Sequence, residues 1–332
     1  MEPATDTILL LSILAAALPA AVYVGLIYAV DRYEKEPVWL LTATFLWGAI
    51  PSILLALLFG LVGSLPLYLL AGPEVGNTLS AVLIAPPVEE TVKALALLGI
   101  FFLLRREVDG LLDGIIYGAM VGMGFAMIEN IFYFLTVYGE SGVEAWQTNI
   151  FMRAILFGLN HSLFTSMTGL GLAVGRFARS KTVRFLAPVG GWTVAVALHA
   201  FHNLAASVGG LLCFILPLTD WGGVWLLMLI IVWALIQEKR WIRSYLKEEV
   251  DRGTITVGQY ERVASSRARH VHCVSLLFTR GPRTYRQAVT FYRQCSELAY
   301  KKHHFALLQE PQSAELTEKL RLKLRELSQQ VG

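Results

Sequence analysis

The apolar residues divide the chain into long apolar segments and a polar C-terminal part. Each segment has about the 20 residues that a helix needs to cross a hydrocarbon core roughly 30 Å thick. The pattern therefore predicts an all-α fold, a polytopic transmembrane helical bundle of about seven spans. The expected spans are Thr7–Val30, Val38–Val62, Leu79–Leu104, Leu111–Tyr138, Ile150–Gly175, Phe185–Leu211 and Trp221–Trp241.

The composition agrees with a membrane protein and argues against a large soluble enzyme. Of the 332 residues, 55% are hydrophobic and only 16% are charged, against about 25% charged residues in soluble domains. The first apolar segment follows Glu2 and Asp6 without any Lys or Arg. Because a signal peptide has a basic start, we interpret this segment as a retained span.

Basic residues alternate between the two ends of successive spans. They follow the first, third, fifth and seventh spans, whereas the loops after the second, fourth and sixth spans contain none. The positive-inside rule then predicts an outside N-terminus and a cytoplasmic C-terminus. The basic residues of the inner loops are Arg32, Lys35, Arg105, Arg106, Arg176, Arg179, Lys181 and Arg184.

The polar part of the chain predicts a separate helical tail. We expect a transmembrane domain over residues 1–237 and a basic helical cytoplasmic tail over residues 238–332. The tail holds 18 Lys and Arg against 10 Asp and Glu, a balance of 18 − 10 = +8. This charge favours a position beside the anionic lipids of the bilayer. The tail carries no nucleic-acid motif, so no nucleic-acid partner is expected.

Four of the expected spans carry glutamate or histidine at one depth. Glu89, Glu129, His161 and His199 all lie about 14–18 Å from the outer face, at 1.5 Å per helical residue. A charged residue in the bilayer core costs about 2.5–3.5 kcal/mol on insertion scales, and such residues usually serve a function. A shared layer is typical of an active site, which we expect at this level.

The chemistry of this layer has two alternatives at this stage. Histidine nitrogens and carboxylate oxygens suit zinc, with Glu129, His161 and His199 as the expected ligands and a glutamate left as general base. Without a metal, Glu89 or Glu90 would activate water directly. A histidine or Asn203 would then stabilise the oxyanion.

Other polar residues of the spans are expected to have structural roles. Lys93 lies four positions after Glu89 and is expected to form an ion pair with it. Asn160 is expected to form an interhelical hydrogen bond. Asp220 is expected in an outer loop, which leaves Asp113, at the start of the fourth span, as the only aspartate within the expected spans and argues against the pair of aspartates of an aspartyl protease.

The motifs of the membrane domain resemble those of the PrsW-type membrane proteases, relatives of the CAAX prenyl endopeptidase and Abi superfamily. The likeness extends from Asp31 to Asn203 and depends on three short motifs that occur in order on separate spans. These motifs are Glu89-Glu90-x-x-Lys93, Phe125-x-x-x-Glu129 and His199-x-x-x-Asn203.

The resemblance implies cleavage of a membrane-anchored protein, such as the anti-sigma factor of a bacterial stress response, in the bacterial cytoplasmic membrane. It also implies metal dependence, although a metal-free glutamate mechanism has support among related enzymes. Two rivals come from other classes: a proton-coupled transporter, which would also bury Glu and His, and a non-catalytic scaffold. The oligomeric state is left open by the sequence.

Overall fold

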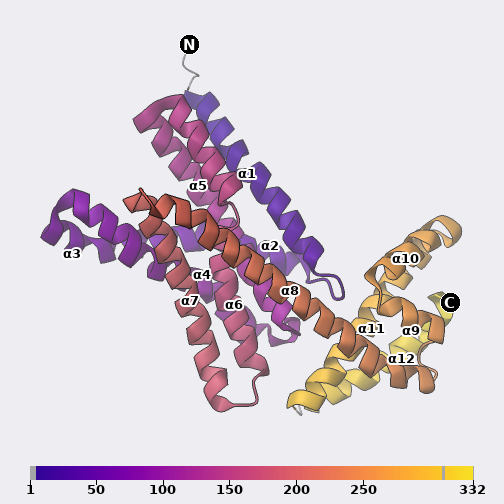
Figure 1. Ribbon diagram of the computed structural model, residues 1–332. Helices are drawn as coiled ribbons and strands as arrows, with labels where there is room; N and C mark the ends of the chain where they lie inside the picture. The colour runs from indigo at the N-terminus through magenta and orange to yellow at the C-terminus, as the bar shows by residue number, and fades with distance from the viewer. Residues whose placement is uncertain (1–4, 309–310, 332) are drawn as a thin grey trace. The chain divides into compact units, whose positions relative to one another are not determined.

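The computed structural model describes residues 5–308 and 311–331, which form helices and turns with no strand among them. This confirms the all-α prediction. Five helical stretches of the described chain are long and apolar enough to cross a membrane. The helices of these stretches are α1 (Thr5–Val30), α2 (Val38–Trp47), α3 (Ile53–Leu79), α4 (Ala85–Leu103), α5 (Leu111–Ile150), α6 (Asn160–Phe177), α7 (Lys181–Val208) and α8 (Leu212–Asp251) (Figure 1).

Two of the five stretches are far longer than one crossing requires. They contain 66 and 67 residues, or about 100 Å of helix at 1.5 Å per residue. Both reverse direction at a glycine with positive φ, Gly72 in α3 (φ 78°) and Gly142 in α5 (φ 76°) (Figure 1). Across the first reversal, the hydroxyl of Tyr68 donates to Asn77 at 2.8 Å. Each long stretch is therefore a helical hairpin rather than one rod.

The centre of the membrane unit is a close contact between α5 and α6. Gly114, Gly118 and Gly122 form a stripe along α5, and added Cβ atoms there would lie only 2.2–2.6 Å from backbone oxygens of α6. At Gly122 the nearest atom is the carbonyl oxygen of His161, at 2.2 Å. Small residues of this kind allow two helix backbones to approach closely. The stripe thus brings His161 against the middle of α5.

Short π-helical turns interrupt the helices around this contact. They are η1 (Gly48–Ser52), η2 (Ser80–Ile84) and η4 (Phe151–Leu156), and η2 leads directly into α4. Pro86 and Pro87 occupy the first turn of α4, where the absent proline N–H is tolerated. Such π turns often occur at functional sites.

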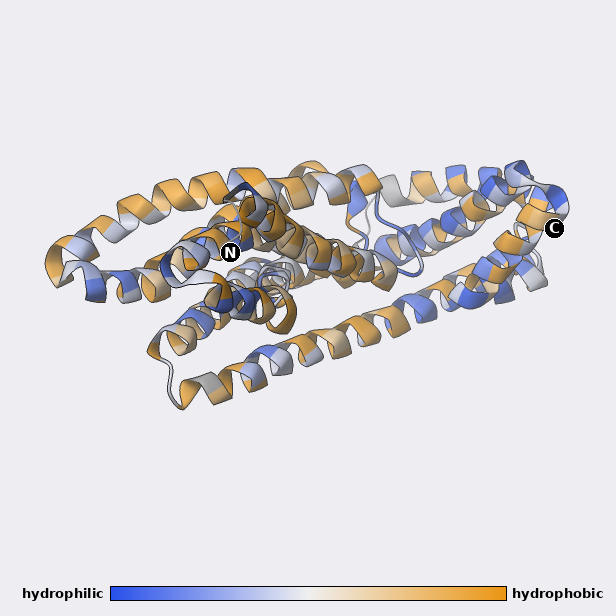
Figure 2. Cartoon of the chain, turned by 90° about the horizontal axis from the view of Figure 1, so that it is seen from above, coloured by the Kyte–Doolittle hydropathy of each residue, from blue (hydrophilic) through white to orange (hydrophobic). Residues whose placement is uncertain are grey.

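The chain folds as two compact units, of which the second contains the chain from Ile231 onward together with residues 31–35. Its helices beyond α8 are α9 (Val257–Val263), α10 (Ser266–Arg280), α11 (Pro282–Leu308) and α12 (Pro311–Val331). Buried apolar side chains such as Phe291 form its core. Figure 2 shows that hydrophilic residues are frequent in these helices, whereas hydrophobic residues predominate in α1–α7.

Glu249 and Arg269 are among the buried charged residues of this second unit. The carboxylate of Glu249 accepts hydrogen bonds from Lys302 at 2.8 Å, Arg321 at 2.8 Å and Thr254 at 3.0 Å. The guanidinium of Arg269 donates to the carbonyl oxygens of Arg32 and Tyr33. The contacts of Arg269 attach residues 31–35 to this unit.

Candidate active site

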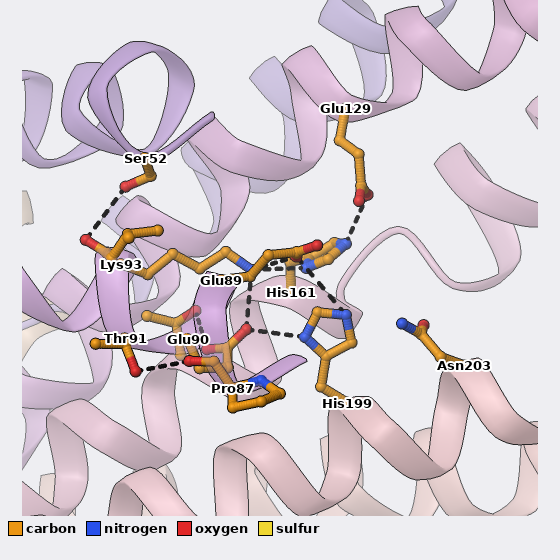
Figure 3. A network of polar contacts seen from close by, with 12 residues as sticks. Ser52, Pro87, Glu89, Glu90, Thr91, Lys93, Glu129, His161, His199 and Asn203 are labelled. Atoms are coloured by element: carbon orange, nitrogen blue, oxygen red, sulfur yellow. Dashed lines mark hydrogen bonds and ion pairs between the residues drawn. The ribbon is translucent and has the colours of Figure 1, made fainter. Parts of the chain in front are cut away.

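Helix α4 supplies three charged side chains to one site (Figure 3). The backbone of α4 is held where the carbonyl oxygen of Val92 accepts a hydrogen bond from the Trp47 indole at 3.1 Å. Glu90 and Lys93 are fully buried, whereas the side chain of Glu89 is 12% exposed. Glu89 is therefore the carboxylate of α4 that can meet a substrate or water.

The buried glutamate of α4 organises its neighbours. One carboxylate oxygen of Glu90 lies 2.8 Å from the Lys93 ammonium and 3.1 Å from Nδ1 of His199, on α7. Its other oxygen accepts a hydrogen bond from Thr165, on α6, at 3.0 Å. The ion pair expected between Lys93 and Glu89 is present at 3.4 Å, although Glu90 is the closer partner. Glu90 thereby fixes the ring of His199, leaving Nε2 3.8 Å from Glu89.

A second glutamate organises the other histidine in the same way. Glu129, on α5, lies 2.9 Å from Nε2 of His161, on α6, and 2.5 Å from the guanidinium of Arg153, in η4. Arg153 also donates to Asn130 at 2.9 Å. Nδ1 of His161 lies 3.1 Å from the Lys93 ammonium. Each histidine is thus oriented by a carboxylate at one nitrogen.

These side chains surround one cavity of about 90 Å³. It brings together five of the six site residues that the sequence predicts, and the sixth, Glu90, lies buried in contact with His199. Polar side chains of α4–α7 and η4 therefore face a shared space. The polar residues that line it are Glu89, Glu129, Asn130, Tyr133, Arg153, Asn160, His161, His199, His202 and Asn203.

Three residues of this cavity could hold a metal ion. Ligand atoms of Glu89, His161 and His199 all lie within 4.8 Å of one another, and two histidines with one glutamate form a known catalytic zinc set. Glu129 does not belong to this group, but its contact with Nε2 of His161 is the carboxylate–histidine contact that commonly orients a zinc ligand. The donor set fits zinc on one condition. The Lys93 ammonium lies 3.1 Å from Nδ1 of His161 and must move away from this nitrogen before the nitrogen can bind zinc.

Asn203 has a definite partner in the backbone. Its side-chain amide donates to the carbonyl oxygen of Ala81 at 2.8 Å. In a π turn the N–H of residue i donates to the carbonyl oxygen of residue i−5. The residue in line to donate to the carbonyl of Ala81 is therefore Pro86, which has no N–H. Asn203 therefore satisfies the carbonyl that the proline leaves open and ties α7 to the entrance of α4.

The structure corrects the expected position of Asp220. It lies within α8, which begins at Leu212, and its side chain is only 5% exposed rather than in an outer loop. Its carboxylate lies 2.7 Å from Nδ1 of His202 and accepts a hydrogen bond from Asn160 at 2.8 Å.

Sequence reasoning therefore missed the polar contacts of Asp220 and did not place Arg153 beside the site. The nearby Pro217 and the pair Gly222-Gly223 indicated a loop, which concealed Asp220. The spacing of Arg153 from His161, two turns along the chain, is a signal that could have placed it near the layer.

Comparisons with known proteins give a consistent result. The sequence model of a family described as "PrsW family intramembrane metalloprotease" matches residues 36–236. Protease PrsW of Geobacillus kaustophilus is 28% identical over 240 residues, which cover 71% of this chain and 93% of that protein. Protease PrsW of Clostridioides difficile is 32% identical over 52% of this chain and 68% of its own length. No solved structure matches the chain.

Proposed function

Because the chain belongs to the PrsW family of intramembrane metalloproteases, we propose that its cavity hydrolyses a peptide bond of a membrane-anchored protein. The substrate class is a single-span regulator such as an anti-sigma factor. The observation that carries the proposal is the meeting of Glu89, His161 and His199 within 4.8 Å in a cavity between helices.

Glu89 is the group that we assign to water activation. Its contacts with Lys93 at 3.4 Å and His199 at 3.8 Å are long, whereas Glu90 and Glu129 have partners at 2.5–3.1 Å. A carboxylate with loose contacts can accept a proton from water as that water attacks the substrate carbonyl. Glu90 and Glu129 act as positioning residues for the two histidines.

The remaining side chains stabilise charge on the substrate. Nε2 of His199 and the second N–H of the Asn203 amide can donate to the oxyanion that forms when water attacks. The first N–H of Asn203 is engaged by Ala81 at 2.8 Å, so the amide is fixed before substrate enters. If zinc were held by Glu89, His161 and His199, it would supply an activated water and polarise the carbonyl, and Glu89 would then be a ligand rather than the proton acceptor.

We further propose seven crossings, an outside N-terminus and a cytoplasmic tail. The reversals at Gly72 and Gly142 support this number because each divides one long helical stretch into two. The basic inner loops support the orientation in the bacterial cytoplasmic membrane. In this topology residues 1–237 are the protease domain, and the first cut is near the extracytoplasmic side.

The test is cleavage of single-span reporter proteins by the purified chain in lipid vesicles. Wild type is compared with Glu89→Ala, Glu90→Ala and His199→Ala, each with and without a zinc chelator. Glu140→Gln, at an exposed position outside the cavity, is the matched control.

We expect cleavage by wild type and Glu140→Gln and at least a 100-fold loss in Glu89→Ala, the magnitude typical of a lost proton-transfer group. Chelation should abolish cleavage if zinc takes part. Absence of cleavage with every reporter, together with proton flux through the vesicle membrane, would replace this proposal with transport.

A further inference from the structure

A second polar cluster lies beside the reacting groups and has no role in the mechanism above. Asp220 of α8 contacts His202 of α7 at 2.7 Å and Asn160 of α6 at 2.8 Å. His202 and Asn160 both line the cavity that contains Glu89. Three helices therefore converge on one carboxylate at the wall of the site.

The hydrogen bonds define how the imidazole of His202 is held. Nδ1 of His202 lies 2.7 Å from a carboxylate oxygen of Asp220 and 3.0 Å from the amide nitrogen of Asn160, which itself donates to the same oxygen at 2.8 Å. The carboxylate is the closer partner and can only accept, so the imidazolium form of His202 donates from Nδ1 to Asp220. Nε2 is then the nitrogen available to a partner in the cavity. A carboxylate at Nδ1 also stabilises the imidazolium form, as it does in hydrolytic triads.

The burial of Asp220 argues against simple helix packing. Its side chain is 5% exposed within an apolar helix, where an acidic side chain is costly. Two amides could join these helices without a buried charge. Aspartate adds the ability to hold a histidine in one tautomer and to balance its positive form.

The position of His202 relates it to the proposed water-activating group. His199 and His202 are three residues apart and therefore lie on one face of α7. The Phe164 ring stacks on His199 at 5.0 Å and lies 6.2 Å from the ring of His202. His199 lies 3.8 Å from Glu89, and Glu89, His199 and His202 all line the same cavity.

We propose that His202 is a catalytic residue that protonates the leaving amine, with Asp220 and Asn160 as its positioning residues. This inference rests on the proposed peptidase function. Water adds to the carbonyl carbon and gives one proton to Glu89. The C–N bond then breaks while the nitrogen takes a proton from Nε2 of His202. Glu89 returns its proton to His202 through cavity water, so one peptide bond and one water are consumed.

The test compares two leaving groups in the same substrate. A segment that wild type cuts is prepared with an amide or a thioester at the scissile bond, and kcat and KM are measured in vesicles. A departing thiolate needs no proton, whereas a departing amine does. The variants are His202→Gln and the isosteric Asp220→Asn, and Glu89→Ala and Glu140→Gln serve as controls.

We expect His202→Gln to lower kcat for the amide by about 100-fold, the usual size of a general-acid contribution, with KM and thioester cleavage nearly unchanged. Asp220→Asn should give the same pattern with a smaller loss. Glu89→Ala should lose both activities. Equal losses on amide and thioester in both variants would show a structural role and overturn the inference, as would full amide activity in His202→Gln. Cleavage of neither substrate by wild type would instead refute the peptidase function itself.

Discussion

The fully buried ion pair of Lys93 and Glu90 has consequences for stability at the scale of single residues. Their charged atoms lie 2.8 Å apart with no solvent exposure. Removing one member leaves an uncompensated buried charge, which costs about 3–5 kcal/mol, whereas replacing both by apolar residues can be nearly neutral. The ion pair of Lys93 and Glu90 therefore contributes more to the arrangement of the active site than to the stability of the fold.

We accordingly expect Glu90→Met alone to lower the unfolding free energy by about 3 kcal/mol. The double variant Glu90→Met/Lys93→Met should recover most of this loss. It should remain inactive, because His199 has lost the carboxylate 3.1 Å from its Nδ1. Denaturation in detergent and reporter cleavage measure the two effects. Recovered activity in the double variant would contradict the positioning role of Glu90.

The group of Glu89, His161 and His199 makes a separate prediction about metal binding. Zinc at 100 times its dissociation constant should stabilise the chain by about 2.7 kcal/mol through binding to the folded state. Thermal unfolding with added zinc measures this without any substrate. His161→Gln should remove the shift, Glu140→Gln should keep it, and magnesium should produce none. An equal shift in wild type and His161→Gln would place the zinc elsewhere.

The sequence predicted that these polar residues share one depth, but not which of them contact one another. Helical rise along the predicted spans brought Glu89, Glu129, His161 and His199 to one depth, and all four line the cavity. Which glutamate faces the cavity depends on the rotation of α4 against its neighbours. That rotation follows from tertiary contacts such as the bond from Trp47 to Val92, which no local pattern contains.

At the scale of the helix, the glycine stripe of α5 is the feature most sensitive to substitution. A Cβ at Gly122 would lie 2.2 Å from the carbonyl oxygen of His161. Gly122→Ala should separate α5 from α6, at a cost of about 1–3 kcal/mol, and reduce cleavage by moving His161. Gly99→Ala is the control, because nothing lies within 4 Å of an added Cβ there. Unfolding and cleavage assays should show a loss in the first variant only.

Helix α11 contains a histidine whose protonation should weaken the second unit. Burial, with a smaller effect of His304, lowers the pKa of His303 to about 4, against about 6.5 in an unfolded chain. Between these values the unfolded state binds more protons, so stability is complete above pH 6.5 and falls as the pH drops towards 4.

We therefore expect the tail of the full chain to become more sensitive to proteolysis as the pH is lowered across this window. Hydrogen exchange of α11 measures the same opening. His303→Phe, which keeps a ring against the indole of Trp241 at 4.0 Å, should reduce the pH dependence. The exposed His270→Gln variant should not. Identical pH profiles for wild type and His303→Phe would exclude His303 as the cause.

The hydropathy pattern predicted which segments are helical more accurately than it predicted where each helix begins and ends. The reversal at Gly72 lies within a helical hairpin where the sequence suggested a loop, because the apolar residues around it are compatible with both. Helix α8 begins nine residues before the expected Trp221, and within it the carboxylate of Asp220 is satisfied by His202 and Asn160 rather than by water. Local patterns describe helix formation, whereas these differences arise from packing.

At the scale of the whole molecule, the proposed topology can be tested by chemical labelling. Ser141, beside the second reversal, and Ser180, between α6 and α7, are both exposed. A membrane-impermeant thiol reagent should label Ser141→Cys in intact cells and Ser180→Cys only after lysis. Wild type is the control for labelling of its own cysteines. The opposite pattern would invert the orientation and place the site nearer the cytoplasm.

The contact of Arg269 with the carbonyl of Arg32 joins positions 237 residues apart in the chain. At about 5–20 residues per second of synthesis, the ribosome needs roughly 12–47 s to add the second partner after the first. During this time, while the membrane helices are inserted, residues 31–35 lack their contact with Arg269. We therefore expect a chain truncated before Arg269 to insert its membrane helices normally. Residues 31–35 of that chain would lack the contact with Arg269 and would be more accessible to quality-control proteases.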